Sequence, residues 1–150
     1  MRACVFVLAA MFVSGCGGDG DGGTPTSPSA PSINVPYSAV DLRVGTGVEA
    51  SNGRSVLINY TGWAYSTTAA DNKGAKFDST LDPGRTPYPF VYPGNFIQGF
   101  TMGLQGMRVG GLRRVVIPPN LGYGNNPPPN QSTIRANETL LFEIELLAVQ

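Results

Sequence analysis

Three segments of the chain alternate apolar and other side chains with a period of two residues. They are residues 56–62, 112–118 and 139–147. The positions that share one face are Val56, Ile58 and Tyr60 in the first segment, Arg113, Val115 and Ile117 in the second, and Leu140, Phe142, Ile144 and Leu146 in the third. Because successive side chains of a β-strand point to opposite faces, the pattern predicts three strands, each with one face against a core.

One short segment between these strands has helical spacing. Phe100, Leu104 and Met107 stand at positions i, i+4 and i+7, which share one face of an α-helix. Gly103 and Gly106 are expected to keep this helix short and to let it pack closely. Many strands and one brief helix predict an α+β fold, in which an antiparallel sheet curls over the helix.

The amino-terminal residues have the features of a secretory signal. Arg2 precedes an apolar run, 5–13, which is shorter than the about 20 residues a helix needs to cross a bilayer. The run ends in Val-Ser-Gly-Cys at 13–16, which resembles the bacterial lipobox, where the signal is cut before a cysteine that then receives lipid. We therefore predict a signal peptide over 1–15 and lipidation of Cys16. The alternative is a plain secretory signal cut near Ala9 or Ala10, with Cys16 incidental.

The next segment, 17–32, contains only Gly, Pro, Ser, Thr, Asp and Ala. Such residues bury too little apolar surface to offset the entropy of ordering them. Residues 16–35, which begin with the predicted lipidation site Cys16, are therefore predicted to form a flexible linker. One folded domain follows over 36–150. In this division the linker tethers the domain to a membrane through lipid, without a spanning helix.

The composition excludes several classes of function. Ten basic side chains balance ten acidic ones and no Lys/Arg cluster occurs, so we expect no binding to nucleic acid. Histidine is absent, which removes Ser-His-Asp, Cys-His and histidine–zinc chemistry. The two cysteines, Cys4 and Cys16, both precede the domain, so no redox pair is expected within it.

Six short segments occur in the order and near the spacing of one known family. They are NYTG at 59–62, KFDS at 76–79, FIQGF at 96–100, GLQGMRVGG at 103–111, VIPPNLGYG at 116–124 and TLLFEIELL at 139–147. Together they resemble the FKBP-type peptidyl-prolyl isomerases, the macrolide-binding immunophilins, over about residues 54–148. A single segment would be weak support, whereas all six in register are specific.

The resemblance implies a half-barrel of antiparallel strands around one short helix, with an aromatic pocket between helix and sheet. The residues that fall on the family's pocket positions are Tyr60, Phe77, Asp78, Phe96, Ile97, Phe100, Tyr123, Ile134 and Phe142. Tyr88 and Phe90 match an aromatic pair that follows a proline, with shifted spacing. Of these, Asp78, Tyr60, Tyr123 and Phe100 are predicted as catalytic, and Phe77, Phe90, Phe96, Ile97, Ile134 and Phe142 as substrate-binding.

The implied reaction needs no nucleophile, metal or cofactor. Rotation about a prolyl amide faces a barrier of about 18–20 kcal/mol because it breaks amide resonance. The twisted amide has lost charge separation, so a dry aromatic pocket favours it over the planar form. We expect Phe100 to lie beneath the proline ring, and the Ile97 N–H and the Tyr123 hydroxyl to bind substrate carbonyls. Asp78 is expected near the rotating carbonyl, bonded to the Tyr60 hydroxyl.

The chain departs from the family pattern at several positions. Phe100 stands where a tryptophan is usual, and the frequent histidine of the last loop is missing. That loop, 125–133, is lengthened, as is the loop between Tyr60 and Phe77. These changes bear on macrolide affinity and on sequence preference more than on basic activity.

Each proposed site residue also has a simpler interpretation. Phe100 and Phe142 could be ordinary core residues, and Asp78 could cap a turn. Tyr123 could be a loop aromatic, and Trp63, just after the first strand, is interpreted as a packing residue.

Three functions are compatible with these features. The first is a membrane-tethered isomerase that acts on Xaa-Pro bonds of exported proteins, with proline-containing polypeptides as partners and a macrolide as a further candidate ligand. The second is a catalytically weak proline-peptide-binding or chaperone module, and the third a surface lipoprotein whose altered loops contact a partner. We expect a monomer at the periplasmic face of the cell envelope. Gly17 after the cysteine favours the outer membrane, because an aspartate there retains lipoproteins at the inner one.

Overall fold

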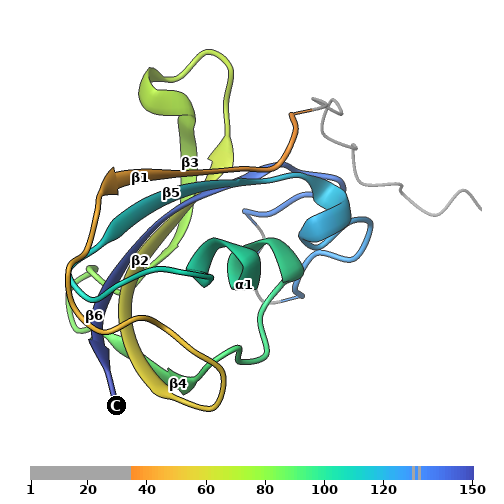
Figure 1. The fold of residues 1–150 in the computed structure, drawn as a ribbon. Coiled ribbons are helices and arrows are strands. Elements are labelled where there is room, and N and C mark those ends of the chain that lie inside the picture. The colour runs from red at the N-terminus through yellow and green to blue at the C-terminus, as the bar shows by residue number, and fades with distance from the viewer. Residues whose placement is uncertain (1–34, 130, 132) are drawn as a thin grey trace, which may run out of the picture.

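The computed structural model describes residues 35–129, 131 and 133–150, which form a six-stranded antiparallel sheet curled around one short helix (Figure 1). The strands are β1 (Ser38–Arg43), β2 (Ser55–Tyr65), β3 (Lys73–Ser79), β4 (Tyr88–Val91), β5 (Leu112–Ile117) and β6 (Leu140–Val149). The helix is α1 (Gln98–Leu104), and two 3₁₀ turns, η1 (Ala70–Asn72) and η2 (Pro119–Leu121), complete the elements. The predicted α+β fold class is confirmed.

The strand order β1-β5-β6-β2-β3 places the two longest strands, β6 and β2, at the centre of the sheet. The free side of β2 is shared: β4 pairs with its first half, Ser55–Ile58, and β3 with its second half, from Thr61 onward. Pairing of Tyr60 with Ile144 and of Gly62 with Phe142 puts the predicted apolar faces of β2 and β6 on one side of the sheet. This side is concave and holds the core.

Helix α1 lies inside the curve of the sheet and packs on β5 (Figure 1). Two glycines allow the close approach. A Cβ added to Gly99 would lie 2.5 Å from Cγ2 of Ile117, and one added to Gly103 would lie 2.6 Å from Cγ2 of Val115. The helix backbone therefore rests directly on the side chains of β5, and Phe100 and Leu104 are buried between helix and sheet.

The prediction that Gly106 lets the helix pack closely was wrong. Gly106 lies beyond the helix, with φ of +71°, and a Cβ there would meet nothing within 4 Å. Its left-handed backbone serves the turn after the helix, in which the Met107 N–H donates to the Leu104 carbonyl at 3.0 Å. Met107 follows the helix and is still buried, as its spacing predicted.

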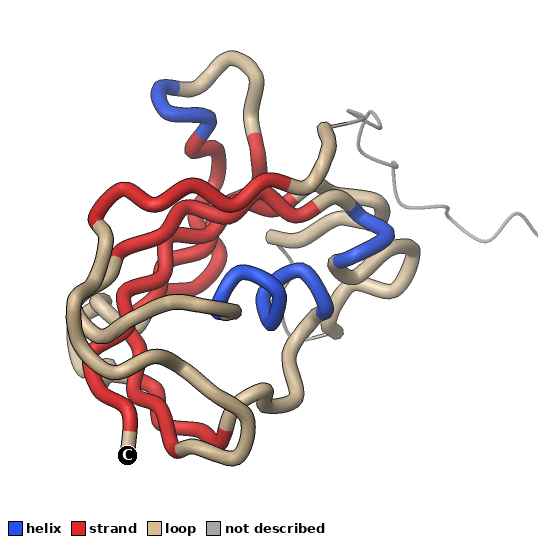
Figure 2. The backbone as a smooth tube through the Cα atoms, in the orientation of Figure 1, coloured by secondary structure: helices blue, strands red, loops and turns tan. Residues whose placement is uncertain are grey.

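The predicted signal peptide, 1–15, the lipidation site Cys16 and the linker up to residue 34 lie outside the described residues. Within the described part of the chain, no helix is long and apolar enough to cross a membrane. The hairpin between β2 and β3, which carries η1, extends away from the body of the sheet (Figure 2).

Candidate functional site

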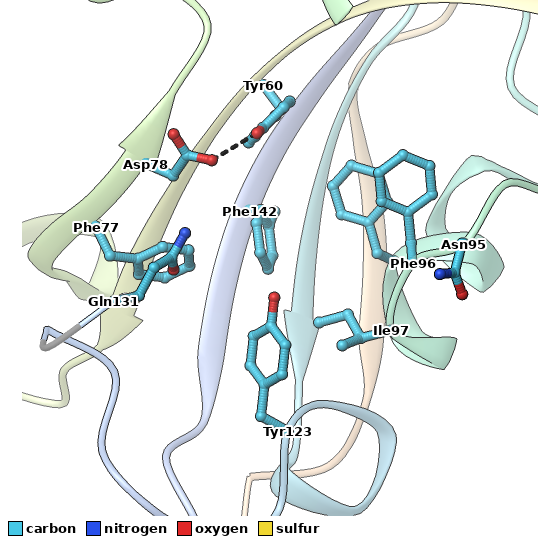
Figure 3. A pocket seen from close by; sticks show the side chains of 10 residues that line it. Tyr60, Phe77, Asp78, Asn95, Phe96, Ile97, Tyr123, Gln131 and Phe142 are labelled. Carbon is cyan, nitrogen blue, oxygen red and sulfur yellow. Dashed lines mark hydrogen bonds between the residues drawn. The ribbon is translucent and has the colours of Figure 1, made fainter. Parts of the chain in front are cut away.

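A cavity of about 350 Å³ opens between the concave side of the sheet and the start of α1. Its walls come from five parts of the chain: β2, β3, the α1 segment, the loop after η2, and β6. The residues that line it are Tyr60, Phe77, Asp78, Asn95, Phe96, Ile97, Phe100, Tyr123, Gln131 and Phe142 (Figure 3). Aromatic rings therefore dominate the lining, and the polar groups are few.

Phe100 is the centre of the aromatic arrangement. Its ring lies edge-to-face with Phe142, at 5.1 Å between centroids, and with Tyr60, at 5.8 Å. Phe96 contacts it at 4.9 Å, and Phe77 extends the cluster through Phe142 at 5.4 Å. Such contacts restrict the position of each ring through the rings next to it. The cavity is thus a preformed apolar cleft.

The Asp78 carboxylate is the only acidic group on the cavity wall among the described residues. The Tyr60 hydroxyl donates to its Oδ2 at 2.6 Å, as expected from the sequence. Its Oδ1 accepts the Ser79 N–H at 2.9 Å and the Arg85 guanidinium at 3.0 Å. Because each oxygen accepts at least one of these donors, the carboxylate is held as a fixed charge at the edge of the cleft.

Both cavity tyrosines are held in the neutral form. Burial raises the pKa of Tyr60 far above its ordinary value of 10, and the hydrogen bond to Asp78 raises it further. Burial also raises the pKa of Tyr123, and the Asp78 charge adds to this effect. Figure 3 shows the Tyr123 hydroxyl pointing into the cavity. This hydroxyl is therefore available as a hydrogen-bond donor at neutral pH.

Ile97, the residue before α1, also lines the cavity. Ile97 precedes the helix with extended dihedral angles (φ −58°, ψ 145°), and its carbonyl accepts the N–H groups of Phe100 and Thr101. The first N–H groups of a helix have no acceptor within it. Since Ile97 lines the cavity, its N–H is a candidate donor for a carbonyl of a bound peptide.

Comparison with known proteins decides the family. Residues 47–147 match the model of the FKBP-type peptidyl-prolyl cis-trans isomerase. An FK506-binding protein of Neisseria meningitidis serogroup B is 38% identical over 109 residues, which cover 73% of this chain and 92% of the relative. The FK506-binding protein 1 of Aspergillus oryzae is 37% identical over 108 residues, covering 70% and 90%. The chain belongs to the FKBP-type peptidyl-prolyl isomerases.

Solved structures of two such proteins have the same fold. FkpA from Escherichia coli aligns with a TM-score of 0.62 and 33% identity, over 76% of this chain and 48% of the FkpA chain. A peptidyl-prolyl cis-trans isomerase from Pseudomonas syringae pv. tomato aligns with a TM-score of 0.60 and 29% identity, over 83% of both chains. This chain spans about half the length of FkpA, so the alignment concerns the shared domain alone.

Most of the residues predicted as site residues of this isomerase do line the cavity. They are Tyr60, Phe77, Asp78, Phe96, Ile97, Phe100, Tyr123 and Phe142. Phe90 is not among the lining residues: it supports Phe96 from β4, at 4.7 Å between ring centroids, with Tyr88 packed on both. Ile134 is not among them either: it lies in the core, with 4% of its surface exposed.

Three polar residues of the site were not predicted. Arg85 reaches Asp78 because Asp82-Pro83-Gly84 makes a turn, in which Arg85 N–H donates to the Asp82 carbonyl at 3.0 Å. A Pro-Gly pair is a turn signal, so this one could have been found from the sequence. Asn95 and Gln131 also line the cavity, and no motif in the sequence indicates either of them.

Trp63 lies away from the cavity lining, in agreement with its interpretation as a packing residue. The Lys73 ammonium sits over its ring at 4.8 Å from the centroid. Among the described residues, no cluster of His, Cys, Asp or Glu side chains could hold a metal ion. The described cleft thus offers apolar surface, the neutral Tyr123 hydroxyl and one fixed carboxylate.

Proposed function

We propose that this isomerase acts on Xaa-Pro bonds of exported proteins, by removing the amide from water and stabilising its twisted form. The observation that carries the proposal is the preformed cleft, which six aromatic residues line and which has one anchored carboxylate at its edge. A ring of proline is apolar and fits among such side chains, whereas the polar planar amide loses its hydration there.

The proposed mechanism gives each side chain a role that fits its contacts. Phe100 forms the floor under the proline ring, with the other rings as walls. The Ile97 N–H and the Tyr123 hydroxyl bind carbonyls on either side of the rotating bond. Asp78, held by Tyr60, faces the rotating carbonyl as a fixed charge and transfers no proton. A few kcal/mol of differential stabilisation gives a useful rate, because about 1.4 kcal/mol is tenfold.

The same cleft is the proposed site for a macrolide ligand, since relatives of this chain carry the name FK506-binding protein. Phe100 keeps an apolar floor there. We further propose that the protein acts as a monomer.

The isomerase proposal is tested on the chain from Gly17 onward with a short Xaa-Pro peptide, by NMR exchange between its cis and trans forms. We expect exchange far faster than the tens to hundreds of seconds of the uncatalysed process. Phe100→Leu removes the flat ring and is expected to lower kcat/KM about tenfold. Tyr65→Phe, a change outside the cavity, should leave the rate unaltered. Exchange no faster than in buffer would contradict the proposal and favour a binding module without turnover.

We propose that lipid on Cys16 holds the protein at the periplasmic face of the envelope, in the outer membrane. The support is the lipobox-like sequence and the linker composition that follows it. Expressed from its own gene sequence, the protein is expected in the membrane pellet, while Cys16→Ser moves it to the soluble fraction with isomerase activity intact. Cys4→Ser is the matched control, because Cys4 lies within the predicted signal. Persistence of the Cys16→Ser variant in the pellet would refute the anchor.

A further inference from the structure

Gln131 is a polar side chain of the cavity wall that the proposed mechanism does not use. It lies on the side of Phe77 and Asp78, across the cavity from Phe96 and Ile97 (Figure 3). Its backbone is held in place on both sides: its N–H donates to the Pro128 carbonyl at 3.1 Å, and its carbonyl accepts the Ile134 N–H at 3.1 Å. The backbone of Gln131 is therefore held by a hydrogen bond to the core residue Ile134.

The Oε1 atom of Gln131 is buried and accepts no hydrogen bond within the described part of the chain. Only one other described side-chain atom is in this state, the Tyr37 hydroxyl, and Tyr37 does not line the cavity. An amide oxygen shielded from water without a donor costs free energy, and most such groups in folded proteins have a partner. Because the oxygen has no surface open to water in the free protein, a bound molecule supplies the missing donor once the Gln131 side chain turns toward the cavity.

The chemistry of an Xaa-Pro peptide limits what that donor can be. Proline nitrogen carries no hydrogen. The proposed mechanism already assigns donors to the peptide carbonyls, the Tyr123 hydroxyl and the Ile97 N–H, while the lining contains few acceptors. Asp78 already accepts from Tyr60, Ser79 and Arg85, and the Asn95 amide is a further acceptor on the wall. On the protein side, the acceptor without a donor is the Gln131 oxygen. On the peptide side, the donors without an assigned acceptor are the backbone N–H groups that flank the proline.

We propose that Gln131 is a specificity-determining residue, whose Oε1 accepts the backbone N–H of a residue adjacent to the substrate proline. The inference rests on the proposed isomerase function and deepens it, because it names a feature of the preferred client. A site with a buried acceptor discriminates against an analogue without the donor, since the acceptor then stays unpaired. The enzyme should therefore disfavour clients in which a second proline replaces the residue that supplies this N–H.

The test uses the whole chain and three peptides: a parent Xaa-Pro peptide and two ester analogues. In each analogue an oxygen replaces one N–H next to proline, either that of Xaa or that of the following residue, without added bulk. We expect kcat/KM to be about tenfold lower for one ester than for the parent, the size of one lost hydrogen bond to a buried group. Gln131→Met, which keeps the length but not the amide, should reduce that difference below about twofold.

Two further variants separate the amide oxygen from a general effect of the loop. Gln131→Glu keeps an acceptor oxygen and should preserve the discrimination. Gln105→Met makes the same chemical change at an exposed position after α1 and should behave as the wild type. Equal rates on all three peptides with the wild type, or an unchanged difference in Gln131→Met, would overturn the inference.

Dissociation constants for the three peptides, from NMR titration, distinguish failure of the inference from failure of the proposed function. If the wild type accelerates no peptide but still binds the parent more tightly than one ester, and Gln131→Met removes that difference, Gln131 determines binding specificity in a module without turnover. If no peptide binds, or all bind equally, the assignment to Gln131 falls.

Discussion

At the scale of single residues, the donors around Asp78 differ in strength. The Arg85 side chain is 52% exposed, and ion pairs in water contribute little. The Tyr60 hydroxyl bonds the carboxylate at 2.6 Å in a half-buried position, where a hydrogen bond to a charged group is stronger. The Tyr60 contact, more than the ion pair, therefore determines where the carboxylate points.

We expect Asp78→Ala to lower kcat/KM for Xaa-Pro exchange about tenfold, because it removes the fixed charge and leaves the Tyr60 hydroxyl without its acceptor. Arg85→Gln should lower it by no more than about twofold. Both are measured by the same NMR exchange experiment, with urea unfolding to show that each variant is folded. An equal loss in the two variants would mean that the ion pair, and not Tyr60, orients the carboxylate.

At the scale of elements, the position of α1 depends on how closely it approaches β5. Gly99 and Gly103 provide the contact on Ile117 and Val115. Arg113 of β5 holds the other end of the helix, donating to the carbonyls of Gly103 and Gln105 at 2.9 and 2.8 Å. These contacts fix where Ile97 and Phe100 project into the cavity.

Gly103→Ala is expected to destabilise the protein by about 1–3 kcal/mol, although alanine is the better helix former. The added methyl would overlap Val115, so the helix must move away from β5. Urea unfolding measures the stability, and kcat/KM should fall with it because Phe100 moves too. Met102→Ala, on the exposed face of the same helix, is the control and should change stability by about 0.5 kcal/mol or less. A neutral or stabilising Gly103→Ala would contradict the close packing.

At the scale of the whole molecule, ion pairs on the convex side connect strands across the sheet. Glu143 of β6 accepts from Arg114 of β5 at 2.8 Å and pairs with Lys73 of β3 at 2.9 Å. Its side chain is only 18% exposed. Burial alone would raise the pKa of Glu143, but hydrogen bonds from Lys73 and Arg114 and their charges together hold it below the ordinary value of 4.5. The ionised carboxylate is therefore more stable in the folded than in the unfolded chain.

This lowered pKa predicts an acid-sensitive contribution to stability. Because the folded pKa is depressed, the contribution is present above pH 4.5 and is lost as pH falls through the folded value. We expect Glu143→Gln to lower the free energy of unfolding by about 1–2 kcal/mol at pH 7, and the difference from wild type to shrink as the pH falls below 4.5. Urea unfolding at several pH values provides the comparison. The control is Glu49→Gln, which breaks an exposed pair with Arg108 and should have little effect on stability at any pH. A loss of unfolding free energy in Glu143→Gln that does not change with pH would contradict this account.

The sequence by itself determined three of the six described strands, the helix and most of the cavity lining. Alternation in β2, β5 and β6 and the spacing of Phe100 and Leu104 are local patterns, and each reflects which side of one element must leave water. The family motifs then indicated the aromatic lining, because each motif carries its pocket residue at a fixed place within an element. The bond between Tyr60 and Asp78 followed from the same motifs.

Only the tertiary structure decided the contacts between segments whose relative path no local pattern encodes. Phe90 and Ile134 stand at pocket positions by sequence, yet packing on Phe96 and in the core keeps them off the cavity wall. Arg85 and Gln131 reach the site through turns, and Gly99 takes the close-packing role because it, and not Gly106, faces β5. The physical reason is that periodicity reports burial along one element, whereas a cavity depends on distances between elements brought together by folding.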